Sequence, residues 1–210
     1  MTHRIHRHRI RDGLTVLLFL ASLGCDGERG SRTTDSAAAT AVVPGIVDSV
    51  FPPEEAMRRF REGVPAVSAL ENAAPSRDSL VRSFVRALER RDTAAVRTMV
   101  MTRAEFAYLY YPTSPHARPP AQQPPALVWF LHLENSEKGV GRALDRFGGQ
   151  RIRLRGYTCA TPPRVEGANT IWDDCPLRIG AGGDTATVRL FAGVIERAGR
   201  FKILSYANDL

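Results

Sequence analysis

The feature that most constrains the fold of this chain is a change of hydrophobic period at Gly148-Gly149. Upstream of these residues, apolar side chains recur every three or four positions, as in residues 80–88, and this spacing is typical of amphipathic helices. Downstream, apolar and polar residues alternate, as in residues 151–155, which is typical of half-buried strands. Helices followed by strands predict an α+β domain, with helices packed on an antiparallel sheet of about four strands.

Capping signals place the expected helices. Pro52-Pro53 followed by two glutamates begins a short helix, Ser76 caps a helix over 77–90, and Asp92 caps the next helix. A short aromatic segment over 103–110 precedes a proline-rich loop, 113–125. The third helical region then restarts or kinks near 136–139 and ends at Gly148. Strands are expected over 152–159, 172–179, 185–195 and 201–207, and tight-turn sequences at 180–184 and 198–200 predict an antiparallel meander of the last three.

Residues 1–24 have the layout of an export signal. Four arginines precede an uncharged, largely apolar run that ends at Gly24, as in signal peptides. Ser22-Leu23-Gly24-Cys25 resembles the lipobox of bacterial lipoprotein precursors, although an aliphatic residue is usual where Ser22 stands. The resemblance implies cleavage before Cys25, attachment of diacylglycerol to this cysteine, and an extracytoplasmic position on a membrane. Asp26 resembles the inner-membrane retention signal of enteric lipoproteins. An ordinary secretory signal and a true start further downstream are the alternatives.

The rest of the chain divides by composition. Residues 26–41 contain no large apolar side chain, so we expect a flexible stalk over 25–43. A partly helical extension follows over 44–74, and a single α+β domain occupies 75–210. The net charge of +7 falls to +4 once the four Arg and one Asp of residues 1–24 are removed. This excess is modest and scattered, so no nucleic-acid partner is expected.

The cysteines indicate a disulfide. With Cys25 lipidated, Cys159 and Cys175 remain as an even pair in an oxidising compartment. We expect them to form a disulfide, and two reduced buried thiols are the alternative. Only His116 and His132 follow the signal segment, and the chain contains no CxxC. A zinc site therefore lacks a ligand set, and neither a metal nor a cofactor is expected.

Three segments carry a further resemblance: the helix over 84–89, the helix opened by Asp92 and the terminal strand 201–206. Together they resemble the nuclear transport factor 2-like fold. This is the cone shared by ketosteroid isomerases and polyketide-cyclase-like proteins. The likeness covers residues 76–209 and implies a curved, cone-like sheet. The proline-rich loop and the segment from Cys159 to Cys175 depart from the usual pattern.

Ketosteroid-isomerase-like proteins place a tyrosine and an acid in the cone to polarise and deprotonate a ligand. The resemblance implies that such residues line a pocket here, and the candidates are Tyr108, Tyr110, Tyr111 and Trp129, with Glu105 or Glu134 as the acid. The alternative is that Phe106, Tyr110 and Trp129 fill the core.

Two classes of function follow. The favoured one is a non-catalytic binding or interaction domain, held at the membrane by its lipid, which takes a small apolar ligand or an envelope protein in a cavity or on an aromatic patch. The alternative is a small-molecule isomerase, cyclase or hydrolase that acts in the same cavity. The first is favoured because no candidate residue lies in a motif specific enough to transfer a catalytic role.

Overall fold

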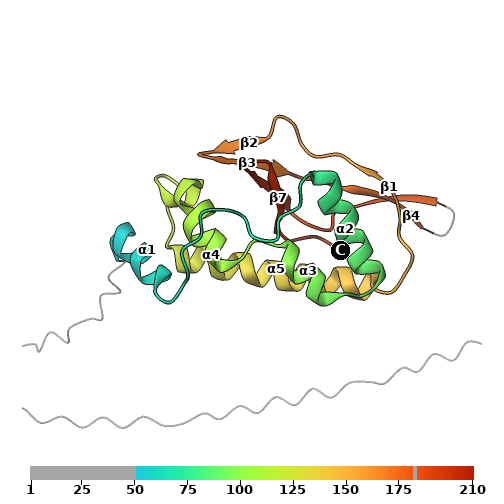
Figure 1. Cartoon of the computed structure of the whole chain (residues 1–210), viewed down its shortest axis with the longest axis horizontal. Coiled ribbons are helices and arrows are strands. Elements are labelled where there is room, and N and C mark those ends of the chain that lie inside the picture. The colour runs from blue at the N-terminus through green and yellow to red at the C-terminus, as the bar shows by residue number, and fades with distance from the viewer. Residues whose placement is uncertain (1–50, 182–183) are drawn as a thin grey trace, which may run out of the picture. The chain divides into compact units, whose positions relative to one another are not determined.

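The computed structural model describes residues 51–181 and 184–210, and Figure 1 shows how their helices and strands are arranged. The predicted signal peptide, Cys25, Asp26, the stalk and the first residues of the extension lie outside these ranges. None of the helices that are described combines the length and the apolarity needed to cross a membrane.

The helices begin where the capping signals predict. The α-helices of the described ranges are α1 (Pro53–Arg61), α2 (Arg77–Glu89), α3 (Thr93–Met99), α4 (Arg103–Glu105) and α5 (Pro125–Phe147). Ser76 Oγ accepts the Ser79 N–H at 3.1 Å, and Asp92 Oδ1 accepts the Ala95 N–H at 2.9 Å. Each cap satisfies a backbone donor that the first helical turn leaves free. These helix starts are therefore determined locally.

The aromatic segment after α4 is wider than an ordinary helix. A π-helix covers Phe106–Tyr110, and short 3₁₀ turns follow at Tyr111–Thr113 and Pro115–Ala117. The Leu109 carbonyl accepts a hydrogen bond from the Asn169 side chain at 2.7 Å. This bond ties the π-helix to the sheet region, and π-helical turns occur frequently at functional sites.

The strands form two antiparallel sheets. One has the order β1–β4–β5 and the other β2–β3–β6–β7. The strand bounds are β1 (Arg153–Tyr157), β2 (Arg164–Glu166), β3 (Asn169–Asp173), β4 (Leu177–Ala181), β5 (Asp184–Val188), β6 (Gly193–Arg197) and β7 (Arg200–Ser205). The α+β class is confirmed, but one sheet of about four strands is replaced by two sheets.

Two interruptions divide the strands that the sequence predicted as continuous. Between β3 and β4, Asp174 has a φ of 44° and Pro176 has no N–H to donate. Between β5 and β6, the neighbours Leu190 and Phe191 are both fully buried, which strand alternation does not allow on a one-sided sheet. Antiparallel pairing across the two predicted tight turns is confirmed, because β4 pairs with β5 and β6 pairs with β7. The prediction that these strands form a single meander is wrong, since the two pairs belong to different sheets.

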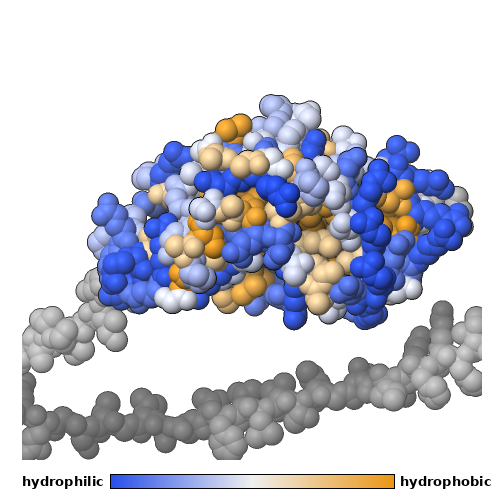
Figure 2. Space-filling view, in the orientation of Figure 1, coloured by the Kyte–Doolittle hydropathy of each residue, from blue (hydrophilic) through white to orange (hydrophobic). Residues whose placement is uncertain are grey.

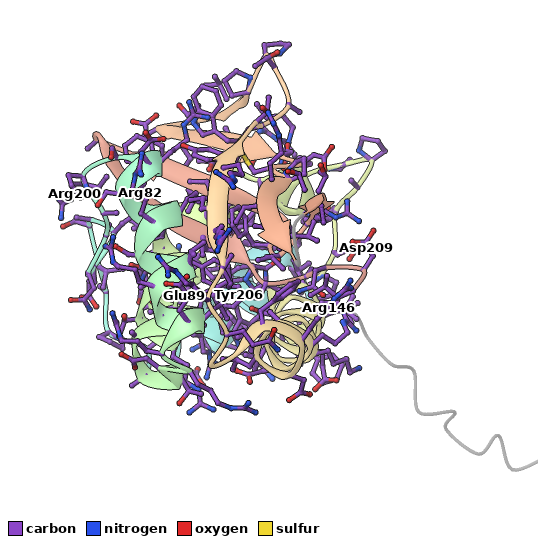
Figure 3. All side chains as sticks on the ribbon, turned by 90° about the vertical axis from the view of Figure 1, so that its right-hand side faces the viewer. Arg82, Glu89, Arg146, Arg200, Tyr206 and Asp209 are labelled. Atoms are coloured by element: carbon purple, nitrogen blue, oxygen red, sulfur yellow. A yellow bond between two sulfur atoms is a disulfide. The ribbon has the colours of Figure 1, made fainter. Side chains whose placement is uncertain are left out.

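The helices pack against β7 and the second half of the chain. The Phe84 ring of α2 stacks on Tyr206 with 5.3 Å between ring centroids, and Phe191 meets the Phe84 ring edge-on at 5.7 Å. The buried Tyr206 hydroxyl donates to the Val96 carbonyl at 2.6 Å, and Figure 3 shows Tyr206 in the interior between helices and strands. This contact joins α2, α3 and the segment after β7 in one core.

Helix α5 is continuous where the sequence predicted a restart or kink. Gly139 lies in its middle, and a Cβ built there would be 1.7 Å from the Tyr206 carbonyl oxygen. The Asn208 side chain also donates to the Gly139 carbonyl at 2.9 Å. The glycine is therefore needed for close approach of the chain after β7, and it does not break the helix. The predicted end is confirmed, because α5 stops at Phe147, directly before Gly148.

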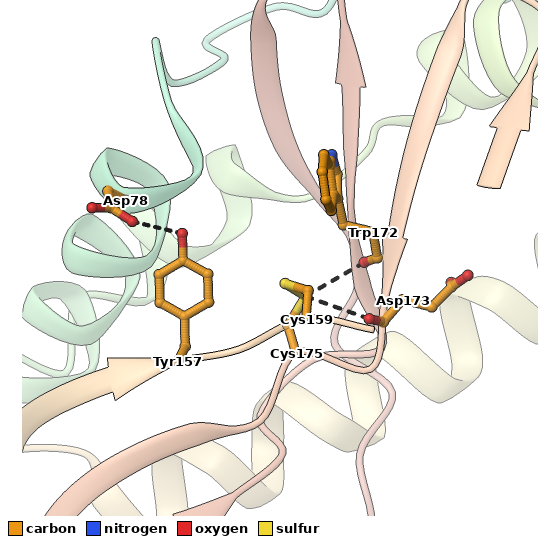
Figure 4. The surroundings of a disulfide bond; sticks show 6 residues. All are labelled: Asp78, Tyr157, Cys159, Trp172, Asp173 and Cys175. Carbon is orange, nitrogen blue, oxygen red and sulfur yellow. Dashed lines mark hydrogen bonds between the residues drawn. A yellow bond between two sulfur atoms is a disulfide. The ribbon is translucent and has the colours of Figure 1, made fainter. Parts of the chain in front are cut away.

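The predicted disulfide is confirmed. Cys159 and Cys175 are bonded with their Cα atoms 4.0 Å apart, slightly closer than the usual range of roughly 4.4–6.8 Å. Figure 4 shows the bond beside Trp172 and Asp173, and Cys175 lies in the connection between β3 of one sheet and β4 of the other. The loop that the disulfide closes contains ladder hydrogen bonds, because β2 and β3 pair as a hairpin within it.

Candidate binding groove and polar cluster

Aromatic rings fill the space between α1, α5 and the π-helix. Phe106 is completely buried, and its ring centroid lies 5.2 Å from that of Trp129 and 5.6 Å from those of Phe60 and Tyr111. Tyr110 is next in this cluster, at 5.9 Å. Tilted and edge-on contacts at these distances are the favoured geometries of packed aromatic cores. Tyr110, Tyr111 and Trp129 therefore pack around Phe106 and do not surround an open cavity there.

Glu105 is a buried structural acid. Lys202 Nζ lies 2.9 and 3.0 Å from its two carboxylate oxygens, and the side chains are 1% and 0% exposed. The Glu71 and Thr102 backbone N–H groups each donate to this carboxylate at 2.7 Å. A buried charge is tolerated when it is paired and fully hydrogen-bonded. Glu105 thus joins α4, the Glu71 backbone and β7, and has these four donor contacts in place of a ligand.

The other nominated residues are dispersed. Glu134 is partly exposed on α5 and pairs with Lys138 at 3.0 Å. The Tyr108 hydroxyl donates to the Val64 carbonyl at 3.4 Å, and the Arg61 guanidinium carbon lies 4.5 Å from the centroid of its ring. The structure therefore does not bring the two acids and the tyrosines into one catalytic group.

Tyr111 lies beside two adjacent hollows between α1 and the proline-rich loop. Their volumes are about 500 and 320 Å³, and Pro53 and Tyr111 line both. We call the pair the α1–loop groove. The larger hollow is also lined by Glu54, Met57, Arg58, Arg61, Pro112 and Ala117, and the smaller by Phe51, Pro52, Ala56, Gln122, Gln123, Pro124 and Pro125. The lining is mostly apolar, with charged residues contributed by α1 alone.

Local hydrogen bonds hold the walls of the groove. The Tyr111 hydroxyl donates to the Gln123 carbonyl at 2.6 Å, which fixes the proline-rich loop. Burial raises the pKa of this hydroxyl, so Tyr111 remains a neutral donor. On the other wall, Arg61 donates to the Ala107 carbonyl at 2.9 Å and attaches α1 to the π-helix. The groove is therefore held by the fold on both sides, as preformed ligand sites usually are.

A polar cluster lies around Arg164 on β2. The Arg164 guanidinium binds the Asp173 carboxylate at 2.5 and 3.1 Å, and it also binds Glu166 Oε1. Glu166 is 6% exposed, and its Oε2 atom has no hydrogen-bond partner among the described residues, nor has His116 Nδ1. Burial raises the pKa of Glu166, and the Arg164 charge opposes the rise. Tyr110 has a pKa of about 12, chiefly because of burial and then because of the Glu166 charge.

Sequence reasoning did not bring Tyr110 together with Glu166. Arg164 and Glu166 are two residues apart on one strand, so they point to the same face, and Gly167 follows at a φ of 62° in the hairpin turn. This alternation in the sequence could have indicated that Arg164 and Glu166 lie on one face of a strand. This signal was missed because no strand was predicted over residues 164–166, and because Tyr110 is far away in the sequence.

A third feature lies near the disulfide, where Figure 4 shows Tyr157 facing Asp78. The Tyr157 hydroxyl donates to Asp78 at 2.7 Å, and burial, followed by this bond, raises the pKa of Tyr157 to about 12. The two residues border a hollow of about 200 Å³ that Arg82 and Arg155 also line. The contact attaches the start of α2 to β1.

The described residues contain no group of three or more His, Cys, Asp and Glu side chains placed to hold a metal ion. No family model, curated protein or solved structure matches this chain.

Proposed function

We propose that this chain is an extracytoplasmic lipoprotein, anchored to the bacterial cell membrane through Cys25, whose folded domain binds an apolar ligand or an apolar segment of an envelope protein. In this proposal the domain is not an enzyme, and the α1–loop groove is its binding site. The observation that carries the proposal is the groove itself, a largely apolar hollow with fixed walls. Apolar concave sites with a few polar groups at the rim are the usual places of small-molecule binding.

We also propose that the folded domain has the cone-like nuclear transport factor 2-like fold. The order of helices before antiparallel strands and the packing of α2 and α5 on β7 support it. With Phe106 and its neighbours in the interior, the ligand binds between α1 and the proline-rich loop.

Binding in the groove is tested with a fluorescent fatty acid, 11-dansylaminoundecanoic acid, as the probe. We expect saturable binding that is weakened at least about tenfold by Ala56→Leu, because three added carbons enter the smaller hollow. Ala94→Leu is the matched control, since Ala94 is exposed on α3 and lines neither hollow. Equal probe binding by both variants, or no saturable binding by the wild type, rules the groove out as the site.

Anchoring is tested separately by fractionation of cells. The wild type is expected in the detergent phase and the Cys25→Ala variant in the aqueous phase, because acyl chains on that cysteine supply the membrane affinity. Mass spectrometry of the N-terminal peptide identifies the lipid. Wild-type protein found entirely in the soluble cytosolic fraction contradicts the proposal. Separation of the two membranes tests the inner-membrane position that Asp26 favours.

A second candidate function, a small-molecule isomerase, cyclase or hydrolase, is favoured by Tyr110 and Glu166. A neutral tyrosine beside a carboxyl group with a raised pKa supplies a hydrogen-bond donor and a proton acceptor. Both side chains are more than nine-tenths buried, and neither lines the groove. Turnover of 3-ketosteroid or ester substrates that is lost in Glu166→Gln and kept in Val165→Gln establishes this function in place of the first.

A further inference from the structure

The first part of α5 is apolar on every side. Residues 125–133 contain no Asp, Glu, Lys or Arg. Pro125 and Val128 are buried, whereas Leu127, Phe130, Leu131 and Leu133 expose between 41% and 57% of their surface. We call these four residues the α5 outer face. A helix that is apolar all round is normally covered on all sides, and a gathered apolar patch marks an interaction surface.

The four residues belong to one exposed surface. Leu127 and Leu131 are four residues apart and Phe130 is three from both Leu127 and Leu133, so they are neighbours along one side of the helix. In Figure 2, apolar residues interrupt the hydrophilic surface in the area where Figure 1 places α4 and α5. The surface is therefore suited to an apolar partner that approaches from outside the fold.

The described part of the chain begins close to the start of α5. Phe51, the first described residue, is 46% exposed and lines the smaller hollow together with Pro124 and Pro125, at the start of α5. About 25 residues separate Phe51 from Cys25. A flexible segment of that length spans roughly 25–30 Å in root mean square. Under the proposed function, a lipid on Cys25 would hold the start of α5 within roughly this distance of the bilayer.

We propose that the α5 outer face, together with Phe51, rests on the lipid bilayer and inserts its apolar side chains into the interfacial region. The inference rests on the lipid anchor of the proposed function. The α5 outer face is separate from the α1–loop groove, and Phe51 alone belongs to both surfaces. A second copy of the chain is a poorer occupant, because a stable protein interface needs roughly 20–30 residues a side and this face offers five. A bilayer needs no such area when a covalent anchor already supplies a high effective concentration.

The test uses the full chain, purified in detergent and reconstituted into vesicles of phosphatidylethanolamine and phosphatidylglycerol. Phe130→Trp places a reporter in the α5 outer face. Val165→Trp is the matched control, since Val165 is 74% exposed on β2, away from α5. Brominated lipids quench tryptophan that enters the bilayer. After subtraction of the emission of the parent chain, we expect the Phe130→Trp signal to fall at least about twofold and the Val165→Trp signal to remain unchanged.

Two further measurements complete the test. The quenching is expected to persist at high salt, because apolar insertion is not screened by ions. The triple variant Leu127→Gln, Phe51→Gln and Leu131→Gln, made in the Phe130→Trp chain, is expected to lose the quenching, while an unchanged far-UV circular dichroism spectrum shows that α5 has folded.

Unquenched Phe130→Trp emission in the vesicle-bound chain overturns the inference. So does a vesicle-independent dimer in sedimentation equilibrium that the triple variant abolishes, because the occupant is then a second copy. Lipid on the N-terminal peptide is measured in the same sample by mass spectrometry. Absence of the lipid anchor is thereby distinguished from failure of the α5 outer face to insert into the bilayer.

Discussion

His132 is expected to make the protein sensitive to acid. It lies on α5 with its ring stacked on Trp129 at 5.5 Å and 6.0 Å from the Phe106 centroid. Its Nε2 atom is buried without a hydrogen-bond partner among the described residues. Burial lowers the pKa of His132 to about 4, and a hydrogen bond with the Leu204 backbone only partly opposes this. The folded protein therefore holds a neutral imidazole in an aromatic core.

The sign of the pH dependence follows from proton binding. Between about pH 6.5 and pH 4 the unfolded chain protonates this histidine and the folded chain does not, so unfolding takes up a proton and the folded state loses stability as the pH falls. Each tenfold change in proton affinity corresponds to about 1.4 kcal/mol. The fall of the pKa from its ordinary value of 6.5 to about 4 therefore corresponds to at most about 3 kcal/mol of lost unfolding free energy at pH 4.

Replacement of His132 by Phe tests this reasoning, because an uncharged ring of similar shape keeps the contacts with Trp129 and Phe106. We expect unfolding free energies within about 1 kcal/mol of the wild type at about pH 7, and a gain approaching 3 kcal/mol relative to the wild type at about pH 4. Urea unfolding followed by fluorescence at several pH values measures the difference. Glu166 acts in the opposite direction, since a raised pKa favours the folded state in acid. Both proteins contain Glu166, so its contribution cancels in the difference between their unfolding free energies. Parallel pH profiles for the two proteins would refute the reasoning.

Three other perturbations have outcomes fixed by the packing. Gly139→Ala forces a Cβ against the Tyr206 carbonyl and is expected to lower the unfolding free energy by about 3 kcal/mol or more. Gly141→Ala is the control, because a Cβ there has nothing within 4 Å, and urea unfolding is expected to show a gain of up to about 1 kcal/mol. Lys202→Met leaves the buried Glu105 carboxylate without its cation, so we expect the unfolding free energy to fall by roughly 3–5 kcal/mol. In a double-mutant cycle, adding Glu105→Gln is expected to recover part of that loss. Replacing both cysteines of the disulfide by Ser lowers the unfolding free energy by about 3 kcal/mol in the chain-entropy model, and dithiothreitol lowers the melting temperature of the wild type but not of that variant.

The local parts of this fold could be predicted from the sequence. The starts of α2 and α3 are fixed by Ser76 and Asp92, which satisfy backbone donors within the first helical turn. The end of α5 before Gly148 and the α+β class follow from the hydrophobic period in the same way. The Cys159–Cys175 pairing was predictable because only two cysteines follow Cys25 in the sequence. In each case the determining residues are close in the sequence or few in number.

The tertiary structure decided what depends on distant parts of the chain. Gly139 looked like a helix break until Tyr206, 67 positions later, was found packed against it. The second sheet was hidden because strand periodicity does not say which strands pair, and a single positive φ at Asp174 separates two strands.

The candidate site residues could likewise be named from the sequence, but only the tertiary structure separated their roles. From sequence, Tyr111 and Glu105 were equal candidates for a pocket. In the folded chain, Glu105 is bound by Lys202 from β7, and Tyr111 lines the α1–loop groove. Residue types and spacing determine which chemistry is available locally, but the partner that buries or exposes a side chain comes from elsewhere in the chain, so only the packed structure separates a structural acid from a wall of the binding groove.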